Sequence, residues 1–363
     1  MFHGNRTESH IFLKTPVCYD TAMLFVRMVA PLLLLLISAG TLAGQDLKIY
    51  FIDVDGGQAT LFVSDNGESM VVDAGWPGND SRDAKKIAAA AKDAGVTKID
   101  YMLTTHYHTD HVGGVEQLAA LIPIRNYLDH GESIEKSPNA TKLYDGYLAL
   151  RSRALHKQLS AGDTLPFGGA QLHVVSARKE VLAKPLNAPG AKAKPAICAE
   201  VQPVKGDGSE NEMSVGFVME YGRFRMIDLG DLLWNEEMAL VCPENKIGDI
   251  DLHLTTHHGF KSSGNPALLN AIRPRVAVMN NGDKKGGDPG HWNTVKSVPT
   301  VVDRWQLQKS VLGDGSHNVA DEKIVSFGPQ TDPAWIKVVA RKNGSFTVSN
   351  SRNGLTTTYG PRR

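Results

Sequence analysis

Short hydrophobic runs bounded by turn residues alternate along the chain with longer stretches of helical character. A hairpin signal, Asp65-Asn66-Gly67, separates the runs 58–63 and 69–73. An Ala- and Lys-rich stretch at 80–94 that stops at Gly95 predicts a helix. The pattern predicts strands at 47–54, 58–63, 69–73, 100–105, 124–128, 164–167, 170–175, 214–221, 223–229, 251–256, 275–279, 335–340, 345–349 and 355–359. It predicts helices at 80–94, 112–121, 140–159, 236–241 and 266–272.

Because these elements alternate in two successive halves, they predict a layered α/β domain. The Lys/Ala/Pro/Gly-rich stretch 178–212 is expected to be a surface loop or lid, since clear strands resume after it. The tetrapeptide Leu103–His106 recurs as Leu254–His257, each time at the end of a predicted strand. This repeat is either a chance match or a sign that two similar halves meet at a common site.

Composition limits the function classes. The 363 residues are 42% hydrophobic and 21% charged, which argues against wholesale disorder. Lys and Arg number 39 and so do Asp and Glu, which argues against a dedicated nucleic-acid binder. This balance excludes neither a local basic patch nor transient binding of a phosphate ester.

The N-terminal region has the pattern of a secretory signal peptide. Arg27 precedes the short apolar run 28–37, and the small residues 38–40 follow it. The alternative is an uncleaved anchor, although the run is short for a bilayer. We interpret residues 1–22 as a mis-called start and expect a periplasmic or secreted protein with no stable membrane anchor after cleavage.

Two cysteines, Cys198 and Cys242, follow this leader. In an oxidising compartment they could form a disulfide, and the alternative is two buried thiols. Their neighbours show no metal-site spacing, so we do not assign them to catalysis.

The segment with the clearest chemistry is His106-Tyr-His108-Thr-Asp110-His111, directly after a predicted strand. Imidazole nitrogens suit a borderline metal such as zinc, and a carboxylate can bind a second ion. In a tight turn, His106 and His108 can face one ion while Asp110 and His111 face another. The alternative is a cluster of solvated surface histidines.

Other candidate residues also follow predicted strands. Asp73 could be a simple turn carboxylate, and Asp231 could be a helix N-cap or a carboxylate that bridges two ions. One residue of the pair His257-His258 is expected to bind metal. The repeated Thr-Thr-His favours His257, which leaves His258 for substrate contact or for orienting a ligand. Asp110 and His258 are the candidate catalytic residues.

These motifs follow one another along the chain in an order that resembles that of the metallo-β-lactamase superfamily. They are most similar to the hydrolase domain of the bacterial DNA-uptake competence protein (ComEC-type), without its membrane channel. Three segments carry the closer resemblance: Asp53–Gln58, Asn211–Ser214 and His257–Ser263. Gln58 departs from that family's usual Asp, and Phe260 from its usual Ser.

The resemblance implies a four-layer αββα sandwich with a hydrolase domain at 45–330 and a β-strand extension of the same domain at 331–363. It also implies two divalent metal ions, zinc or alternatively manganese. The first ion would be held by His106 and His108, with His130 as a candidate for a third histidine that has no obvious match. The second ion would be held by Asp110, His111, Asp231 and His257, and Asp231 would bridge the two ions. Asp73 and Asp53 would orient ligands.

The expected function is metal-dependent hydrolysis of a phosphodiester or related small ester, with a metal-bound hydroxide as nucleophile. The first alternative is a lactone or β-lactam hydrolase, and the second is a non-catalytic binding module with a degraded metal site. Because the chain is neutral overall, we expect a small or short phosphodiester substrate and no extended nucleic-acid binding.

Overall fold

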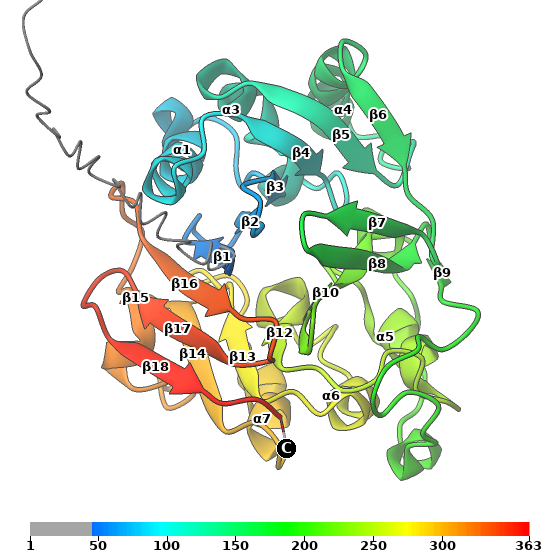
Figure 1. Ribbon diagram of the computed structural model, residues 1–363. Coiled ribbons are helices and arrows are strands. Elements are labelled where there is room, and N and C mark those ends of the chain that lie inside the picture. Colours follow the sequence, from blue (N-terminus) through cyan, green and yellow to red (C-terminus); the bar gives the residue numbers. More distant parts are fainter. Residues whose placement is uncertain (1–45, 363) are drawn as a thin grey trace, which may run out of the picture. The chain divides into compact units, whose positions relative to one another are not determined.

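The computed structural model describes residues 46–362, which form two nine-stranded sheets (Figure 1). The predicted signal peptide lies outside the described residues. The first sheet has the strand order β18-β17-β16-β1-β2-β3-β4-β5-β6. Its strands are β1 (Leu47–Ile52), β2 (Thr60–Val63), β3 (Ser69–Val72), β4 (Ile99–Leu103), β5 (Ile124–Asp129), β6 (Leu155–Gln158), β16 (Trp335–Ala340), β17 (Phe346–Asn350) and β18 (Thr356–Tyr359).

The second sheet has the order β15-β14-β13-β12-β11-β10-β8-β7, and β9 pairs with β8. Its strands are β7 (Thr164–Phe167), β8 (Ala170–Ala177), β9 (Glu180–Val181), β10 (Gly216–Tyr221), β11 (Phe224–Asp228), β12 (Leu252–Leu254), β13 (Val276–Met279), β14 (Asp303–Gln308) and β15 (Ile324–Ser326). Strands β16 to β18 fall in the expected extension 331–363 and continue the first sheet beside β1.

The inner faces of the two sheets pack on each other through one hydrophobic cluster. Phe62 on β2 meets Phe217 on β10 edge to face, with ring centroids 6.0 Å apart and both side chains fully buried. Alternation creates such faces: along β16, Ile336, Val338 and Ala340 point into this core while the residues between them are partly exposed. The sheets therefore form the two central layers.

Helices cover the outer faces and complete the four layers. They are α1 (Arg82–Ala94), α2 (Thr109–Val112), α3 (Val115–Leu121), α4 (Pro138–Arg151), α5 (Trp234–Val241), α6 (Pro266–Ile272) and α7 (Pro289–Ser297). Ile87 of α1 and Leu118 of α3 pack on the first sheet. Leu240 of α5 and Leu268 of α6 pack on the second. The expected αββα sandwich is confirmed. Within residues 46–362, no helix has the length and apolar character needed to span a bilayer.

One expected helix is wrong in extent. The stretch 140–159 was expected to be a single helix, but α4 ends at Arg151 and residues 155–158 form the edge strand β6. Parallel pairing of β6 with β5 outweighs the local helical preference. The pattern also gave no signal for α7, β14 or β15, which lie in a polar, Gly-rich part of the chain.

The strand order gathers several chain segments at one end of the sandwich. Strands β3, β4 and β5 are parallel neighbours in the first sheet, and β11, β12 and β13 are parallel neighbours in the second. The carboxyl ends of parallel strands lie at the same edge of a sheet, where ligands bind in open α/β sheets. The segments that follow β3, β4, β11 and β12 are those that carry Asp73, His106, Asp231 and His257.

A disulfide joins Cys198 to Cys242. Cys198 lies in the long segment between β9 and β10, which was expected to be a loop or lid and contains only short 3-10 turns. Cys242 is the residue that follows α5. The bond therefore ties this loop to the helix that packs on the second sheet.

The first prediction concerns this bond. Replacing both cysteines, as Cys198→Ser with Cys242→Ser, should lower the free energy of unfolding by about 2–4 kcal/mol, because a closed loop restricts the unfolded chain. Urea unfolding of the oxidised proteins measures the difference. Wild type unfolded in the presence of a reductant is the control and should match the double variant. Equal stability of oxidised wild type and the double variant would contradict the prediction.

Helices α5 and α6 are connected by a buried carboxylate. Glu237 accepts a hydrogen bond from the backbone N–H of Asn265, the N-cap of α6, at 2.7 Å. Burial raises the pKa of Glu237 to about 7. The folded state therefore retains a proton on Glu237 at pH values where the unfolded chain has lost it.

The second prediction follows from this pKa. The free energy of unfolding should fall as the pH rises from about 4.5 to 7, because the folded state binds more protons than the unfolded state in that window. In the Glu237→Gln variant, the free energy of unfolding should fall by up to about 3 kcal/mol less over the same pH range. Denaturation at pH 5 and pH 8 measures it, with the exposed Glu116→Gln as control. The same loss of stability in wild type and Glu237→Gln would disprove this account.

Candidate metal centre

The His106–His111 segment folds directly after β4. Asp110 and His111 lie in the short helix α2, whose N-cap is His108. The turn after β1 supports this helix, because the N–H of Gln58 donates to the carbonyl of Asp110 at 3.1 Å. A Cβ at Gly57 would lie 2.6 Å from the same carbonyl oxygen, so the close approach requires glycine there.

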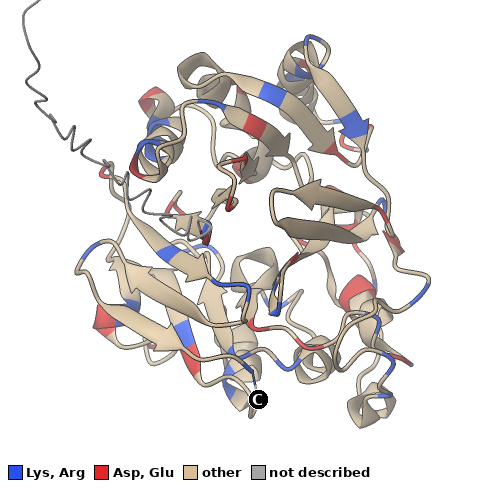
Figure 2. Cartoon of the chain, viewed as in Figure 1, with Lys and Arg blue, Asp and Glu red and all other residues tan. Residues whose placement is uncertain are grey.

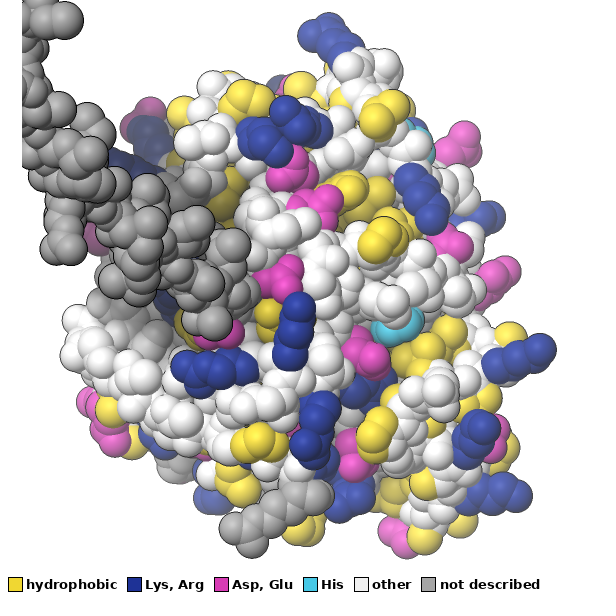
Figure 3. All heavy atoms as spheres, viewed as in Figure 1, with side chains coloured by type: hydrophobic (Ala, Val, Ile, Leu, Met, Phe, Trp, Pro, Cys, Tyr) yellow, Lys and Arg dark blue, Asp and Glu magenta, His cyan; other side chains and the backbone are white. Residues whose placement is uncertain are grey.

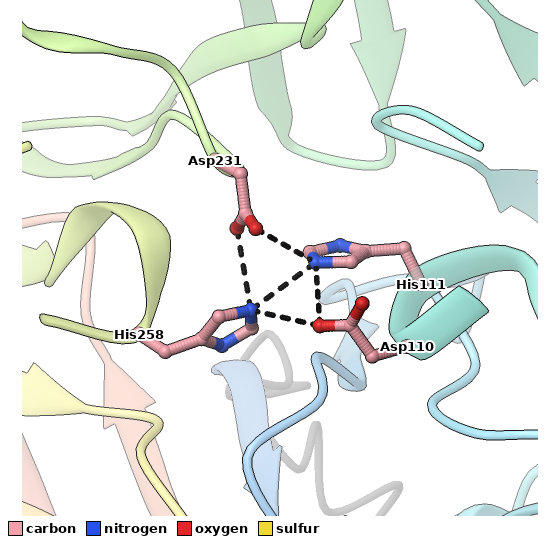
Figure 4. Close-up of side chains that lie close together, drawn as sticks. All are labelled: Asp110, His111, Asp231 and His258. Carbon is pink, nitrogen blue, oxygen red and sulfur yellow. Dashed lines mark hydrogen bonds and ion pairs between the residues drawn. The ribbon is translucent and has the colours of Figure 1, made fainter. Parts of the chain in front are cut away.

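Four buried side chains from both halves of the chain converge at this point (Figure 4). One donor atom from each of Asp110, His111, Asp231 and His258 lies within 4.8 Å of the others. His111 Nε2 is 3.3 Å from Asp110 Oδ2 and 3.2 Å from Asp231 Oδ2. His258 Nε2 is 3.2 Å from Asp110 Oδ2, 3.4 Å from Asp231 Oδ1 and 3.2 Å from His111 Nε2. We call these four residues the Asp/His cluster.

Two further histidines lie next to the Asp/His cluster. His106 Nε2 is 3.0 Å from His108 Nδ1 and 3.9 Å from Asp231 Oδ2. His106 is fully buried, while His108 is partly exposed and lies 3.4 Å from Glu135. Asp231 therefore lies close to His106 as well as to His111 and His258.

Asp73 fixes the orientation of His111. Its Oδ2 lies 2.7 Å from His111 Nδ1, and its two oxygens accept hydrogen bonds from the backbone and hydroxyl of Thr105 at 2.8 and 2.7 Å. With Nδ1 paired to a carboxylate, the Nε2 lone pair of His111 is directed into the cluster. Asp73 thus contacts the histidine that it was expected to orient, and its role toward a bound metal stays a prediction.

The charges in the cluster shift one another's pKa values. Burial alone would lower the pKa of His111, but Asp231, Asp110 and Asp73 raise it well above its ordinary value. Burial alone would raise the pKa of Asp231, but His111, His258 and His257 hold it well below its usual range. The pKa of Asp110 is likewise held low, mainly by His111 against the effect of burial. Both carboxylates thus stay ionised and require positive charge beside them.

The donor set fits a divalent cation. Asp231 Oδ1 is buried without a hydrogen-bond partner, so one lone-pair donor of the cluster is unused. Two imidazole nitrogens with two carboxylate oxygens suit a borderline metal such as zinc. His106 and His108, together with Asp231, could hold another ion.

The structure places His258 in the Asp/His cluster, whereas the repeated Thr-Thr-His had favoured His257 as the metal ligand. Both residues have positive φ values of 53° in a 3-10 turn, so consecutive side chains leave it in different directions. His257 Nε2 lies 3.5 Å from Asp231 Oδ2, and its Nδ1 lies 3.2 Å from the hydroxyl of Ser263. His257 is therefore at the margin of the cluster.

His130 is not brought into the cluster. Its Nε2 lies 2.9 Å from Glu210 Oε2, and its ring packs on Tyr107 with centroids 4.6 Å apart. Glu210 also accepts hydrogen bonds from the backbone of Tyr107 and Ile134, so its carboxylate ties three loops together. The buried Glu210 engages the imidazole of His130, and no sequence signal marked Glu210 for this role.

Asp53 was expected to orient a metal ligand, but its carboxylate connects strands of the two sheets. It accepts hydrogen bonds from Gln308 at 2.8 Å and Ser326 at 2.6 Å, and so ties β1 to β14 and β15. Gln58, the departure from the competence-protein pattern, donates to Asp228 at 3.0 Å and accepts from Asn280 at 3.2 Å. This amide links the two sheets beneath the site.

Lys285, which the sequence pattern did not single out, reaches the cluster from the loop between β13 and α7. Its ammonium forms an ion pair with Asp110 and donates to the carbonyl of Gly56 at 2.7 Å. The dipeptide Lys284-Lys285 in a Gly-rich stretch was the available signal, but many surface loops have the same composition.

Comparison with known families agrees with this geometry. Residues 52–223 match the family model of the metallo-beta-lactamase superfamily, and this match supports the expected metallo-hydrolase class. A UPF0173 metal-dependent hydrolase (SERP1270) of Staphylococcus epidermidis is 36% identical over 63 residues, 17% of this chain and 24% of the relative. The chain thus spans about a quarter of the length of the curated relatives that it matches.

Two solved structures illustrate the structural relatives. The metallo-beta-lactamase fold protein YhfI from Bacillus subtilis has a TM-score of 0.43 and 12% identity, covering 72% of this chain and 96% of that one. CmlA, a diiron beta-hydroxylase from Streptomyces venezuelae, has a TM-score of 0.37 and 16% identity, covering 71% and 47%. At such scores neither relative carries weight for metal, substrate or mechanism.

The third prediction concerns Asp73. Asp73→Asn should weaken metal binding about 10- to 100-fold, because the amide no longer fixes the tautomer and orientation of His111. Titration with zinc against a chromophoric chelator measures the affinity, and circular dichroism checks the fold. Asp145→Asn, at an exposed position on α4, is the matched control. Unchanged zinc affinity in a folded Asp73→Asn protein would show that Asp73 does not support a metal ligand.

Proposed function

Because residues 52–223 match the metallo-beta-lactamase superfamily, we propose that the chain is an exported two-metal hydrolase that cleaves a phosphodiester or a related small ester. The observation that carries the proposal is Asp231, whose Oδ2 lies 3.2 Å from His111 Nε2 and 3.9 Å from His106 Nε2, while its Oδ1 lies 3.4 Å from His258 Nε2. A carboxylate in this position can be shared by two cations. Zinc is the proposed metal and manganese the alternative.

Different residues of the chain would hold the two cations. His106 and His108 would hold one cation, while Asp110, His111 and His258 would hold the other, with Asp231 between them. When bound, two divalent cations lower the pKa of coordinated water and stabilise charge on the attacking and leaving oxygens. Asp73 keeps His111 oriented, and burial of the cluster strengthens every charge interaction in it.

Three contacts support a phosphodiester as substrate. Each segment that resembles the competence-protein hydrolase touches a candidate ligand or its neighbour. Gln58 donates from its backbone to Asp110, the hydroxyl of Ser214 accepts from the N–H of Asp231 at 3.2 Å, and Ser263 pairs with His257. The closer resemblance is therefore concentrated around the site, where substrate preference is determined.

Charge distribution supports a small or short substrate. Lys and Arg are interspersed with Asp and Glu over the elements and over the face in view (Figures 2 and 3). Extended nucleic-acid binding uses basic side chains gathered into a groove or stripe. Export is supported by the leader pattern, and the Cys198–Cys242 disulfide is of the kind that persists in oxidising compartments.

The fourth prediction tests this function. The purified protein should hold about two divalent ions per chain by elemental analysis and hydrolyse bis(4-nitrophenyl) phosphate in a metal-dependent way. Asp110→Ala should reduce kcat/KM at least about 100-fold, because it removes a metal ligand that no neighbour replaces. Asp145→Ala, an exposed Asp on α4, is the control and should retain full activity.

Other outcomes would decide against the proposal. Metal-dependent hydrolysis of a lactone or a chromogenic cephalosporin, with no turnover of the phosphodiester, would favour the lactone or β-lactam alternative. Less than one bound ion per chain after metal loading would exclude the two-metal site and favour a non-catalytic binding module.

A further inference from the structure

Lys285 is the only Lys or Arg among residues 46–362 that forms an ion pair with a member of the Asp/His cluster. Its ammonium pairs with Asp110 and also donates to the carbonyl of Gly56. The nitrogen lies 5.1 Å from the ring centroid of Trp76 and 6.0 Å from that of Phe260. The side chain retains 28% exposure, so solvent reaches it.

The loop that carries Lys285 is held firmly against the metal centre. The N–H of Gly287 donates to the carbonyl of His258 at 2.8 Å, and the N–H of Gly282 donates to the carbonyl of Lys285 at 2.8 Å. A Cβ at Gly286 would lie 2.1 Å from the carbonyl oxygen of His258. The close packing of this loop requires glycine at 286, and it fixes the base of the lysine side chain beside the cluster.

We propose that Lys285 binds the anionic group of the substrate, with the rings of Trp76 and Phe260 close to its ammonium. The inference rests on the proposed hydrolase function and narrows its substrate class to anionic esters such as phosphodiesters. The ammonium of Lys285 pairs with Asp110, a candidate metal ligand. An anion bound at the metal site could therefore contact this ammonium as well. The two rings offer flat apolar contacts to the group that the ester carries, and they partly shield the ammonium from water.

A competing interpretation gives Lys285 a different role. Its ammonium could only neutralise Asp110 while no cation is bound. In that case, removing the ammonium would strengthen metal binding and leave the affinity for anions unchanged. The two interpretations therefore make opposite predictions for two separate measurements.

The fifth prediction uses three variants. Lys285→Met should raise KM for bis(4-nitrophenyl) phosphate, and Kd for inorganic phosphate measured by calorimetry on the metal-loaded protein, by about 10- to 100-fold. Lys285→Arg should restore most of both, since it keeps the charge. KM for the neutral ester 4-nitrophenyl acetate and the metal content should change less than about twofold. Lys284→Met, at the exposed neighbouring position, should behave as wild type.

Two results would overturn the proposal. One is an equal loss for the neutral and the anionic ester, which would indicate a general defect of the site. The other is tighter metal binding in Lys285→Met with an unchanged Kd for phosphate, which is the charge-neutralising role. If wild type does not hydrolyse the phosphodiester, the proposed function fails, while the phosphate calorimetry still decides the role of Lys285.

Discussion

The arrangement of this protein depends on keeping two carboxylates and two imidazoles together out of water. Asp110, Asp231, His111 and His258 are all buried, and removing ionised carboxylates from water is costly unless opposite charge is supplied. The cluster meets this requirement internally, because imidazoles lie between the carboxylates and Lys285 pairs with Asp110. The same arrangement gives a cation a set of converging donors.

The αββα sandwich makes the convergence possible. Asp110 and His111 come from the segment after β4 in the first sheet, and Asp231 and His258 come from the segments after β11 and β12 in the second. No single segment could supply the cluster. Hydrogen bonds across the sheets hold the two halves in place, since Gln58 from the first half pairs with Asp228 and Asn280 from the second. The fold, and not the cluster side chains alone, therefore fixes the positions of the candidate metal ligands.

Much of the fold was predictable from the sequence, because alternation and turn signals are local properties. The strands that carry the site were expected within a few residues of where they occur. The edge strand β6 and the elements α7, β14 and β15 were not expected, because tertiary contacts decide their conformation. The dense motif His106–His111 pointed to the segment that supplies Asp110 and His111 to the Asp/His cluster, since its residues are adjacent in sequence.

The choice between neighbouring side chains was harder to predict. Local spacing could not show that two positive φ values at residues 257 and 258 would direct His258 into the cluster. Nor could it show that Glu210, 80 positions from His130, would engage that imidazole. Lys285 and Asp110 are 175 positions apart in the sequence, and composition does not indicate contacts between residues so far apart. Contacts between distant segments determine these roles.

The most direct test of the central claim is to locate the metal in crystals of the zinc-loaded protein by anomalous scattering at the zinc edge. A peak is expected within about 2.0–2.2 Å of one donor atom each of Asp110, His111, Asp231 and His258. A second peak is expected beside His106 and His108. Zinc bound elsewhere, with the Asp/His cluster free of anomalous density, would contradict the assignment of these residues as a metal centre.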